Sequence, residues 1–266
     1  MPRIESAALS LGTLDSLAYR DSWVHRIDPR IKLLTTLIFI VTVASFDKYA
    51  ISGLLPFFIF PLALLLGGRL PARPLLNRLL LVAPFAVLIG IFNPLFDQAP
   101  LLQIGAWSIS GGWVSFVSIL LRFTLTVGAA LILIATCSFP GICMALEKLG
   151  APRVFTVQLL LLYRYLFVLI EEALRLVRAR ALRSFHGRGL GIKVFGQLVG
   201  QLLLRTLDRA GRIHLAMLCR GFDGNIRTRG TLAISRREIF FLLGWSGLFL
   251  LLRCINLPQR LGALFT

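Results

Sequence analysis

The sequence predicts an all-α integral membrane protein with about five transmembrane helices, or six, and two long basic cytosolic helices. Hydrophobic residues make up 57% of the 266 positions and charged residues only 15%, whereas soluble domains are roughly half apolar and a quarter charged. Several apolar runs approach the ~20 residues that cross a bilayer. The net charge of +17 is concentrated in one part of the chain. A disordered chain and a disulfide-rich secreted domain are therefore excluded.

Five apolar runs are expected to cross the membrane as helices. They cover about residues 31–46, 50–68, 79–96, 113–137 and 239–252. Asp28 and Pro29 precede the first run and favour a helix start, because Asp caps the end and Pro fits the first turn. We therefore expect a cytosolic leader at 1–30, transmembrane helices 1–4 at 31–137, cytosolic or interfacial helices at 138–237 and a last transmembrane helix at 238–266.

The charge distribution predicts the orientation. Residues 138–237 carry seventeen Lys and Arg against five Asp and Glu, and the basic segment 69–78 separates the second run from the third. The loops near 47–49 and 97–112 contain Lys48 as their single basic residue. Because basic loops stay in the cytosol, the N-terminus and the basic middle segment are expected there, in a multi-pass protein of the plasma (inner) membrane.

A sixth apolar run, 154–170, is ambiguous. It contains Arg164 and is followed by Glu171 and Glu172. If it crossed the membrane, the basic stretch after it would lie outside the cell, against the charge rule. We therefore interpret it as a helix at the inner interface, and a sixth crossing stays open, as does the side of the C-terminus.

The basic middle segment contains a repeated pattern at the ends of two expected helices. The pattern is A-x-x-x-R-[SG]-F, and its two arginines, Arg183 and Arg220, are 37 positions apart. The first helix continues through 171–183, where Glu171 and Arg175 form a favourable i,i+4 pair, and the second begins near Ile192. The pattern residues are Ala179, Arg183, Ser184 and Phe185 in the first copy and Ala216, Arg220, Gly221 and Phe222 in the second.

Each residue type in the pattern suits docking to a protein partner. Alanine lets a partner backbone approach, arginine presents a rigid charged fork to carboxylates or carbonyls, Ser or Gly ends the helix, and Phe offers an anchor. Two equivalent tips predict two equivalent sockets, as a two-fold soluble partner would provide. The simpler interpretation is that these arginines meet only lipid phosphate; the repetition favours docking.

The sequence also resembles the transmembrane T component of energy-coupling-factor (ECF) transporters, most closely the CbiQ type of cobalt importers. The resemblance covers nearly the whole chain and rests on HRIDPRIKL at 25–33, LEKLGAP at 146–152, YRYLF at 163–167, EEA at 171–173 and the two arginine motifs. The first motif departs from the family pattern because Leu182 separates Ala181 from Arg183, so either Ala179 or Ala181 could make the close contact.

The resemblance implies that this chain is a scaffold. It would couple ATP hydrolysis by partner subunits to the import of cobalt ions for cobalamin supply. The implied partners are two copies of a cytosolic ATP-binding subunit, a substrate-binding membrane subunit of the CbiM type and a small accessory membrane subunit of the CbiN type. Nickel or a vitamin is the alternative substrate. The chain has no Walker A loop, so we expect no enzyme activity and no cofactor here, with ATP and Mg bound by the ATPase, and no metal site in this chain.

Two arginines inside apolar runs need separate explanations. Arg122 within 113–137 would be costly in lipid, so we expect it to face the bundle interior or water and to have a structural partner. Arg164 is predicted to form an internal ion pair with Glu171 or Glu172. Both are interpreted as structural.

Three other classes of function are disfavoured. A membrane-embedded enzyme would need a carboxylate pair or a Ser, Cys and His arrangement near a span end, and the twelve acidic residues mostly lie among arginines. A nucleic-acid binding module would need aromatic side chains interleaved with arginine. A self-contained carrier would show inverted repeats and broken helices.

Overall fold

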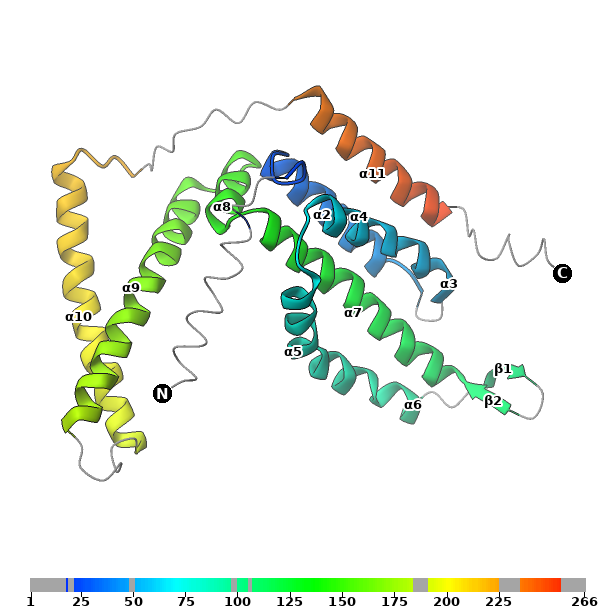
Figure 1. Cartoon of the computed structure of the whole chain (residues 1–266), viewed down its shortest axis with the longest axis horizontal. Helices are drawn as coiled ribbons and strands as arrows, with labels where there is room; N and C mark the ends of the chain where they lie inside the picture. Colours follow the sequence, from blue (N-terminus) through cyan, green and yellow to red (C-terminus); the bar gives the residue numbers. More distant parts are fainter. Residues whose placement is uncertain are drawn as a thin grey trace. The chain divides into compact units, whose positions relative to one another are not determined.

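The computed structural model describes residues 18, 22–47, 51–96, 100–104, 107–183, 191–224 and 235–254. The chain divides into two compact units, and each is considered by itself. One unit contains the apolar helices on either side of the middle segment, and the other contains the middle segment. In both, the described part of the chain is almost entirely helical (Figure 1), which confirms the predicted fold class.

The apolar unit is built around one long helix, α7, which contacts α2, α4, α5 and α6, while α11 packs on α2. Its helices are α2 (Pro29–Ala44), α3 (Ile51–Leu54), the 3₁₀ turn η1 (Leu55–Phe58), α4 (Ile59–Gly67), α5 (Ala72–Gly90), α6 (Phe92–Phe96), α7 (Gly111–Thr136) and α11 (Arg236–Cys254). Each of the five apolar runs is therefore helical, as predicted.

Aromatic side chains form the centre of this unit. Phe39 of α2, Phe57 of η1, Phe60 of α4 and Phe249 of α11 are each at most 1% exposed. The ring of Phe39 lies 4.7 Å from that of Phe60 and 5.2 Å from that of Phe249, measured between centroids. Tilted and edge-to-face rings at such distances stabilise beyond the area that they bury. Three of the apolar runs are thus held together by one cluster.

Polar contacts at the start of α2 join it to α11. The Asp28 side chain accepts a hydrogen bond from the Arg30 backbone N–H (2.9 Å), so the predicted Asp-Pro start signal is confirmed. The Asp28 backbone N–H donates to Glu238 Oε1 (2.9 Å), and Ser235 N–H donates to Glu238 Oε2 (2.8 Å). Glu238 therefore completes the first turn of α11, as in a capping box, and fixes the start of α2 beside it.

Two boundaries differ from the prediction. The third run was expected to begin at residue 79, with 69–78 as a loop, but α5 begins at Ala72. Pro74 does not prevent this, because the first helical turn needs no backbone N–H from it. The loop expected at 97–112 contains a two-stranded antiparallel hairpin, β1 (Pro100–Ile104) and β2 (Trp107–Ser110), and α7 starts directly after it.

The second unit consists of α8 (Phe139–Lys148), α9 (Arg153–Arg183) and α10 (Ile192–Cys219). A turn with Gly150 at φ +105° separates α8 from α9, and the Phe139 ring stacks on that of Tyr163 at 4.6 Å. By length and composition, three described helical stretches are able to cross a membrane, namely Ala72–Pro94, Gly111–Thr136 and Arg153–Arg183. The ambiguous run 154–170 is thus the first half of a continuous helix of 31 residues.

Candidate functional site

The two predicted motif ends belong to a helical hairpin formed by α9 and α10. The helices run in opposite directions; they lie close together near the end of α9 and the start of α10 and diverge toward the other end (Figure 1). There, residues 155–169 of α9 face residues 206–217 of α10 across a groove. Arg183 ends α9 next to the start of α10, whereas Arg220 follows the far end of α10. The 28 steps from residue 192 to 220 correspond to about 40 Å at 1.5 Å per residue. The two arginine tips therefore lie at opposite ends of the hairpin.

The end of α10 has the geometry of a Schellman motif. The Phe222 backbone N–H donates to the Met217 carbonyl (3.0 Å), and the Gly221 N–H donates to the Leu218 carbonyl (2.9 Å). Gly221 has φ +76°, the left-handed conformation that favours glycine at this position. The glycine of the motif therefore terminates the helix for a local conformational reason.

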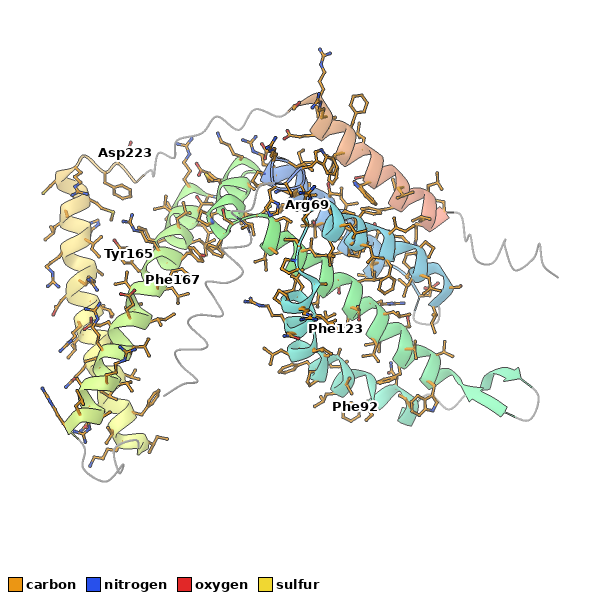
Figure 2. All side chains as sticks on the ribbon, in the orientation of Figure 1. Arg69, Phe92, Phe123, Tyr165, Phe167 and Asp223 are labelled. Carbon is orange, nitrogen blue, oxygen red and sulfur yellow. The ribbon has the colours of Figure 1, made fainter. Side chains whose placement is uncertain are left out.

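The side chains at this end are accessible. Ala216 and Arg220 are exposed, one helical turn apart, while Phe222 is half-buried. Asp223 follows directly beyond the helix (Figure 2). The predicted arrangement of a small residue and an exposed guanidinium on one helix end is therefore present, but Phe222 is already partly covered within the chain.

The end of α9 is described as far as Arg183. Arg183 is exposed, and so is Ala179 one turn before it, whereas Ala181 is half-buried. Ala179 thus has the same spacing and the same exposure as Ala216 in the other copy. The remaining residues of this copy, Ser184 and Phe185, lie outside the described residues.

An ion pair joins the two helices between the tips. Arg205 Nη1 of α10 lies 2.7 Å from Glu172 Oε1 of α9, and the Glu172 side chain is 19% exposed. Glu171 pairs with Arg175 at 3.5 Å on α9, as its i,i+4 spacing predicts. Sequence reasoning missed the Glu172–Arg205 pair because the two residues are 33 positions apart and no periodicity links them.

The predicted pairing of Arg164 with these glutamates is wrong. Among the described residues, Glu171 is paired with Arg175 and Glu172 with Arg205. Arg164 lies two turns before the glutamates on the same helix, a rise of about 10 Å, and each glutamate has a nearer arginine. The Glu172–Arg205 pair therefore joins α9 to α10, whereas the predicted ion pair would have lain within α9.

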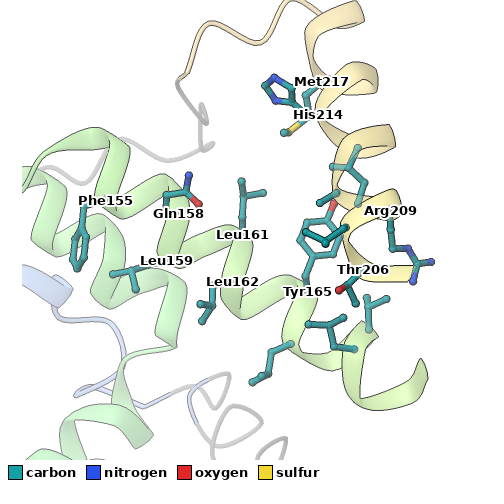
Figure 3. A pocket seen from close by; sticks show the side chains of 16 residues that line it. Phe155, Gln158, Leu159, Leu161, Leu162, Tyr165, Thr206, Arg209, His214 and Met217 are labelled. Atoms are coloured by element: carbon teal, nitrogen blue, oxygen red, sulfur yellow. The ribbon is translucent and has the colours of Figure 1, made fainter. Parts of the chain in front are cut away.

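The groove between α9 and α10 has a volume of about 720 Å³ and a mostly apolar lining (Figure 3). Leu162 and Tyr165 line it from α9, and Thr206, His214 and Met217 from α10. No described residue of α10 is buried, and several of its leucines, such as Leu203, Leu207 and Leu215, are exposed although they are apolar. The hairpin thus presents an apolar surface along with its basic tips, and single-sequence periodicity did not locate the groove.

Arg122 has a structural partner at the end of the first apolar helix. Its Nη2 donates to the Asp47 backbone carbonyl. Arg253 of α11 donates to the neighbouring Ser45 carbonyl at 2.8 Å and lies over the Phe46 ring at 4.3 Å. Two arginines from different helices thereby donate to two carbonyls that follow the end of α2.

The chain contains three histidines, a residue type that often binds metal ions. Among the residues with described positions, no group of three or more His, Cys, Asp or Glu side chains lies together as a metal site would require. His214 lines the groove, and His25 bonds Ser22 Oγ through Nδ1 at 2.6 Å. His186 falls outside the described residues.

Apolar helices around α7, together with a basic helical hairpin that has an exposed arginine at each end, are the features of an all-α membrane protein. The family model described as CbiQ, cobalt transport protein, matches residues 20–232, and the chain belongs to this family, the transmembrane components of ECF-type transporters.

Relatives with established names agree with this membership. The cobalt transport protein CbiQ of Salmonella typhimurium is 26% identical over 53% of this chain and 68% of its own length. The energy-coupling factor transporter transmembrane protein EcfT of Streptococcus thermophilus is 26% identical over 77% of this chain and 83% of its own. A putative fused cobalt transport protein CbiMQ of Methanocorpusculum labreanum is 32% identical over 30% of this chain and 13% of its own.

Proposed function

We propose that this chain is the non-catalytic scaffold of an ATP-driven cobalt importer and that it transmits movement from two cytosolic ATP-binding subunits to a substrate-binding membrane subunit. The cobalt transport description of the family model and the name of the Salmonella relative support cobalt. Nickel or a vitamin is the alternative, because the name of the Streptococcus relative specifies no substrate. The fused CbiMQ relative supports a partner of the CbiM type, and a small CbiN-type subunit would complete the membrane part.

The main support for this proposal is the separation of the two arginine tips of the hairpin. Its exposed tips, Arg183 and Arg220, are about 40 Å apart along the helix axis, which exceeds the ~30 Å thickness of the hydrocarbon core. If α9 crossed the membrane, the two tips would lie on opposite sides. Both reach the cytosol only if the hairpin lies along the inner membrane surface. Its apolar groove then faces the bilayer or a membrane partner, and the N-terminus is cytosolic.

Two separate tips fit two copies of one ATPase better than a single socket. Ala179 and Ala216 permit close approach one turn before each arginine, and each guanidinium offers a bidentate donor. When ATP binding draws the two ATPases together, the tips move with their sockets and the angle between α9 and α10 changes. The Glu172–Arg205 pair between the tips holds the helices together as this happens. The coupling requires that the sockets favour different helix angles in the two nucleotide states.

Charge reversal at the tips tests the proposal. Arg183→Glu and Arg220→Glu, singly and together, are introduced into the assembled transporter, and recovery of the ATPase on the tagged chain is measured along with uptake of radioactive cobalt and nickel. Loss of an interfacial charged hydrogen bond costs about 2–5 kcal/mol, so each single variant should weaken ATPase recovery clearly and the double variant should abolish cobalt uptake.

Arg212→Glu is the matched control, because Arg212 is an exposed arginine of α10 two turns before the tip. It should leave recovery and uptake unchanged. Normal uptake by the double tip variant would refute the coupling role. Uptake of nickel in preference to cobalt would retain the coupling role and replace the substrate.

A further inference from the structure

The groove of the hairpin has a narrow end, and an ion pair lies there. The residues that line the groove from α9 reach as far as Leu169, and those that line it from α10 begin at Thr206. Glu172 lies just beyond the first set and Arg205 directly before the second, and the two side chains are joined at 2.7 Å. The Glu172–Arg205 pair therefore marks the point from which α9 and α10 diverge (Figure 1).

On one side of this ion pair the two helices are separated by the groove. Figure 3 shows Tyr165 of α9 and Thr206 of α10 close together at the narrow end, and Phe155 and Met217 far apart at the wide end. Side chains that interlock resist a change in the angle between helices, but no described residue of α10 is buried. The open half of the hairpin can therefore change its angle without displacing tightly packed side chains.

On the other side of the ion pair the two helices lie close together (Figure 1). Leu176, one turn beyond Glu172 on α9, is buried. Leu198 and Leu202, which precede Arg205 on α10, are half-buried. The ion pair thus lies between a half of the hairpin with apolar side chains covered and a half that is open.

The charges around Glu172 favour contact over a range of helix angles. Arg205 approaches its carboxylate most closely, and Arg175 of α9 and Arg209 of α10 attract the same carboxylate. Attraction between charges falls off slowly with distance, whereas the fit of interlocking side chains depends on the crossing angle of their helices. The pair can therefore persist while the angle between α9 and α10 changes.

The position of the pair determines how far each tip moves when the angle changes. At 1.5 Å per residue, Arg183 lies about 17 Å beyond Glu172 along α9, and Arg220 lies about 22 Å beyond Arg205 along α10. With arms of these lengths, a rotation of about 10° at the pair moves Arg183 by about 3 Å and Arg220 by about 4 Å. A small rotation at this point is therefore linked to movements of similar size at both tips.

We propose that the Glu172–Arg205 pair is the pivot about which α9 and α10 change their angle, which rests on the proposed function because the ATPase sockets must move the two tips. The pair is a positioning element that lies away from both tips. It converts movement of the tips into rotation about one fixed point. Without it, α10 would slide along α9, and less of the movement would reach the substrate-binding membrane subunit.

Loss of the pair tests the pivot in the assembled transporter. Glu172→Gln and Arg205→Gln keep both tips, so recovery of the ATPase on the tagged chain should be unchanged. A partly exposed ion pair changes an equilibrium by up to about fivefold, so uptake of cobalt or nickel per ATP hydrolysed should fall about two- to fivefold in each variant. The double variant should lose no more than either single variant, because the pair is already absent.

Two further variants separate a pivot from a general effect on the hairpin. Arg205→Lys keeps the positive charge and should retain most of the uptake per ATP. Glu171→Gln is the matched control, because Glu171 is the neighbouring glutamate and pairs with Arg175 within α9; it should leave uptake per ATP unchanged. Normal uptake per ATP in Glu172→Gln, or an equal loss in Glu171→Gln, would overturn the pivot.

Distances between spin labels, attached to cysteines in an otherwise cysteine-free chain, measure the rotation itself. Gln158→Cys and His214→Cys label the wide end of the groove, and Leu169→Cys and Leu207→Cys label the narrow end. When ATP binds to the assembled transporter, the distance at the wide end should change and the distance at the narrow end should not. An equal change at both ends would overturn the pivot and leave the role of the tips intact. Unchanged distances at both ends during uptake would overturn the change of helix angle, and with it both the pivot and the proposed coupling.

Discussion

Lys32 is a lysine of α2 that is only 4% exposed. Its Nζ donates to the carbonyl of Thr136 at 3.0 Å and lies 3.5 Å from that of His25. Thr136 is the last residue of α7, where helix carbonyls have no intrahelical partner, and a cation there also interacts favourably with the helix dipole. A single side chain thus joins the start of one apolar helix to the end of another.

We predict that Lys32→Met destabilises the purified protein. The methionine keeps the apolar stem but leaves the Thr136 carbonyl buried without its donor, which costs about 1–3 kcal/mol. The melting temperature in detergent measures the effect. Lys193→Met is the control, because Lys193 is exposed on α10 and its replacement should change little. Equal melting temperatures for the two variants would contradict the structural role of Lys32.

Helix packing in the apolar unit depends on close approach at a glycine. A Cβ added to Gly90, at the end of α5, would lie 2.8 Å from Cδ2 of Phe116 on α7. Just beyond it, Asn93 Nδ2 donates to Ser115 Oγ at 2.9 Å. Small residues are favoured where membrane helices approach closely, and here the glycine leaves room for an aromatic ring.

Gly90→Leu is therefore expected to separate α5 from α7 and to destabilise the protein by about 1–3 kcal/mol, as overpacking does. A second substitution, Phe116→Ala, removes the ring that the leucine would meet and should restore part of the loss. Thermal unfolding of both single variants and the double variant gives the interaction free energy between the two sites. Additive losses would show that the glycine is not required for this contact.

At the scale of the whole molecule, the positions of the two tips decide how many partners the hairpin can reach. Arg183 and Arg220 end antiparallel helices, and their separation of about 40 Å exceeds the reach of one side-chain socket. The repeated sequence pattern alone does not distinguish tips that lie together from tips that lie apart. Only the antiparallel pairing of α9 and α10 separates them.

We predict that the tips cross-link to two different copies of the ATPase. In a chain without its native cysteines, Arg183→Cys and Arg220→Cys are each treated with a short bifunctional thiol reagent in the assembled transporter. Each single variant should join one ATPase copy, and the double variant two, as read from the mass of the product. Arg212→Cys should give no product. A single ATPase copy in the double variant, or a link between the tips themselves, would contradict this arrangement.

Much of the fold follows from local properties of the sequence. The apolar runs, the Asp28-Pro29 start and the Gly221 end were each predicted and are present, because helix formation and helix termini depend on residues within a few positions of one another. The repeated arginine tips were found for the same reason. The boundary at residue 79 was wrong because a proline in the first turn of a helix is compatible with it, which composition does not reveal.

The sequence by itself thus determined that this is a helical membrane protein with two basic helix ends of one pattern, since hydropathy and spacing are carried by neighbouring residues. The tertiary structure decided which segments meet. It paired Glu172 with Arg205 in place of Arg164, and it set the tips at opposite ends of a hairpin. These contacts join residues distant in the chain, and they arise from the packing of whole helices, which no local pattern encodes.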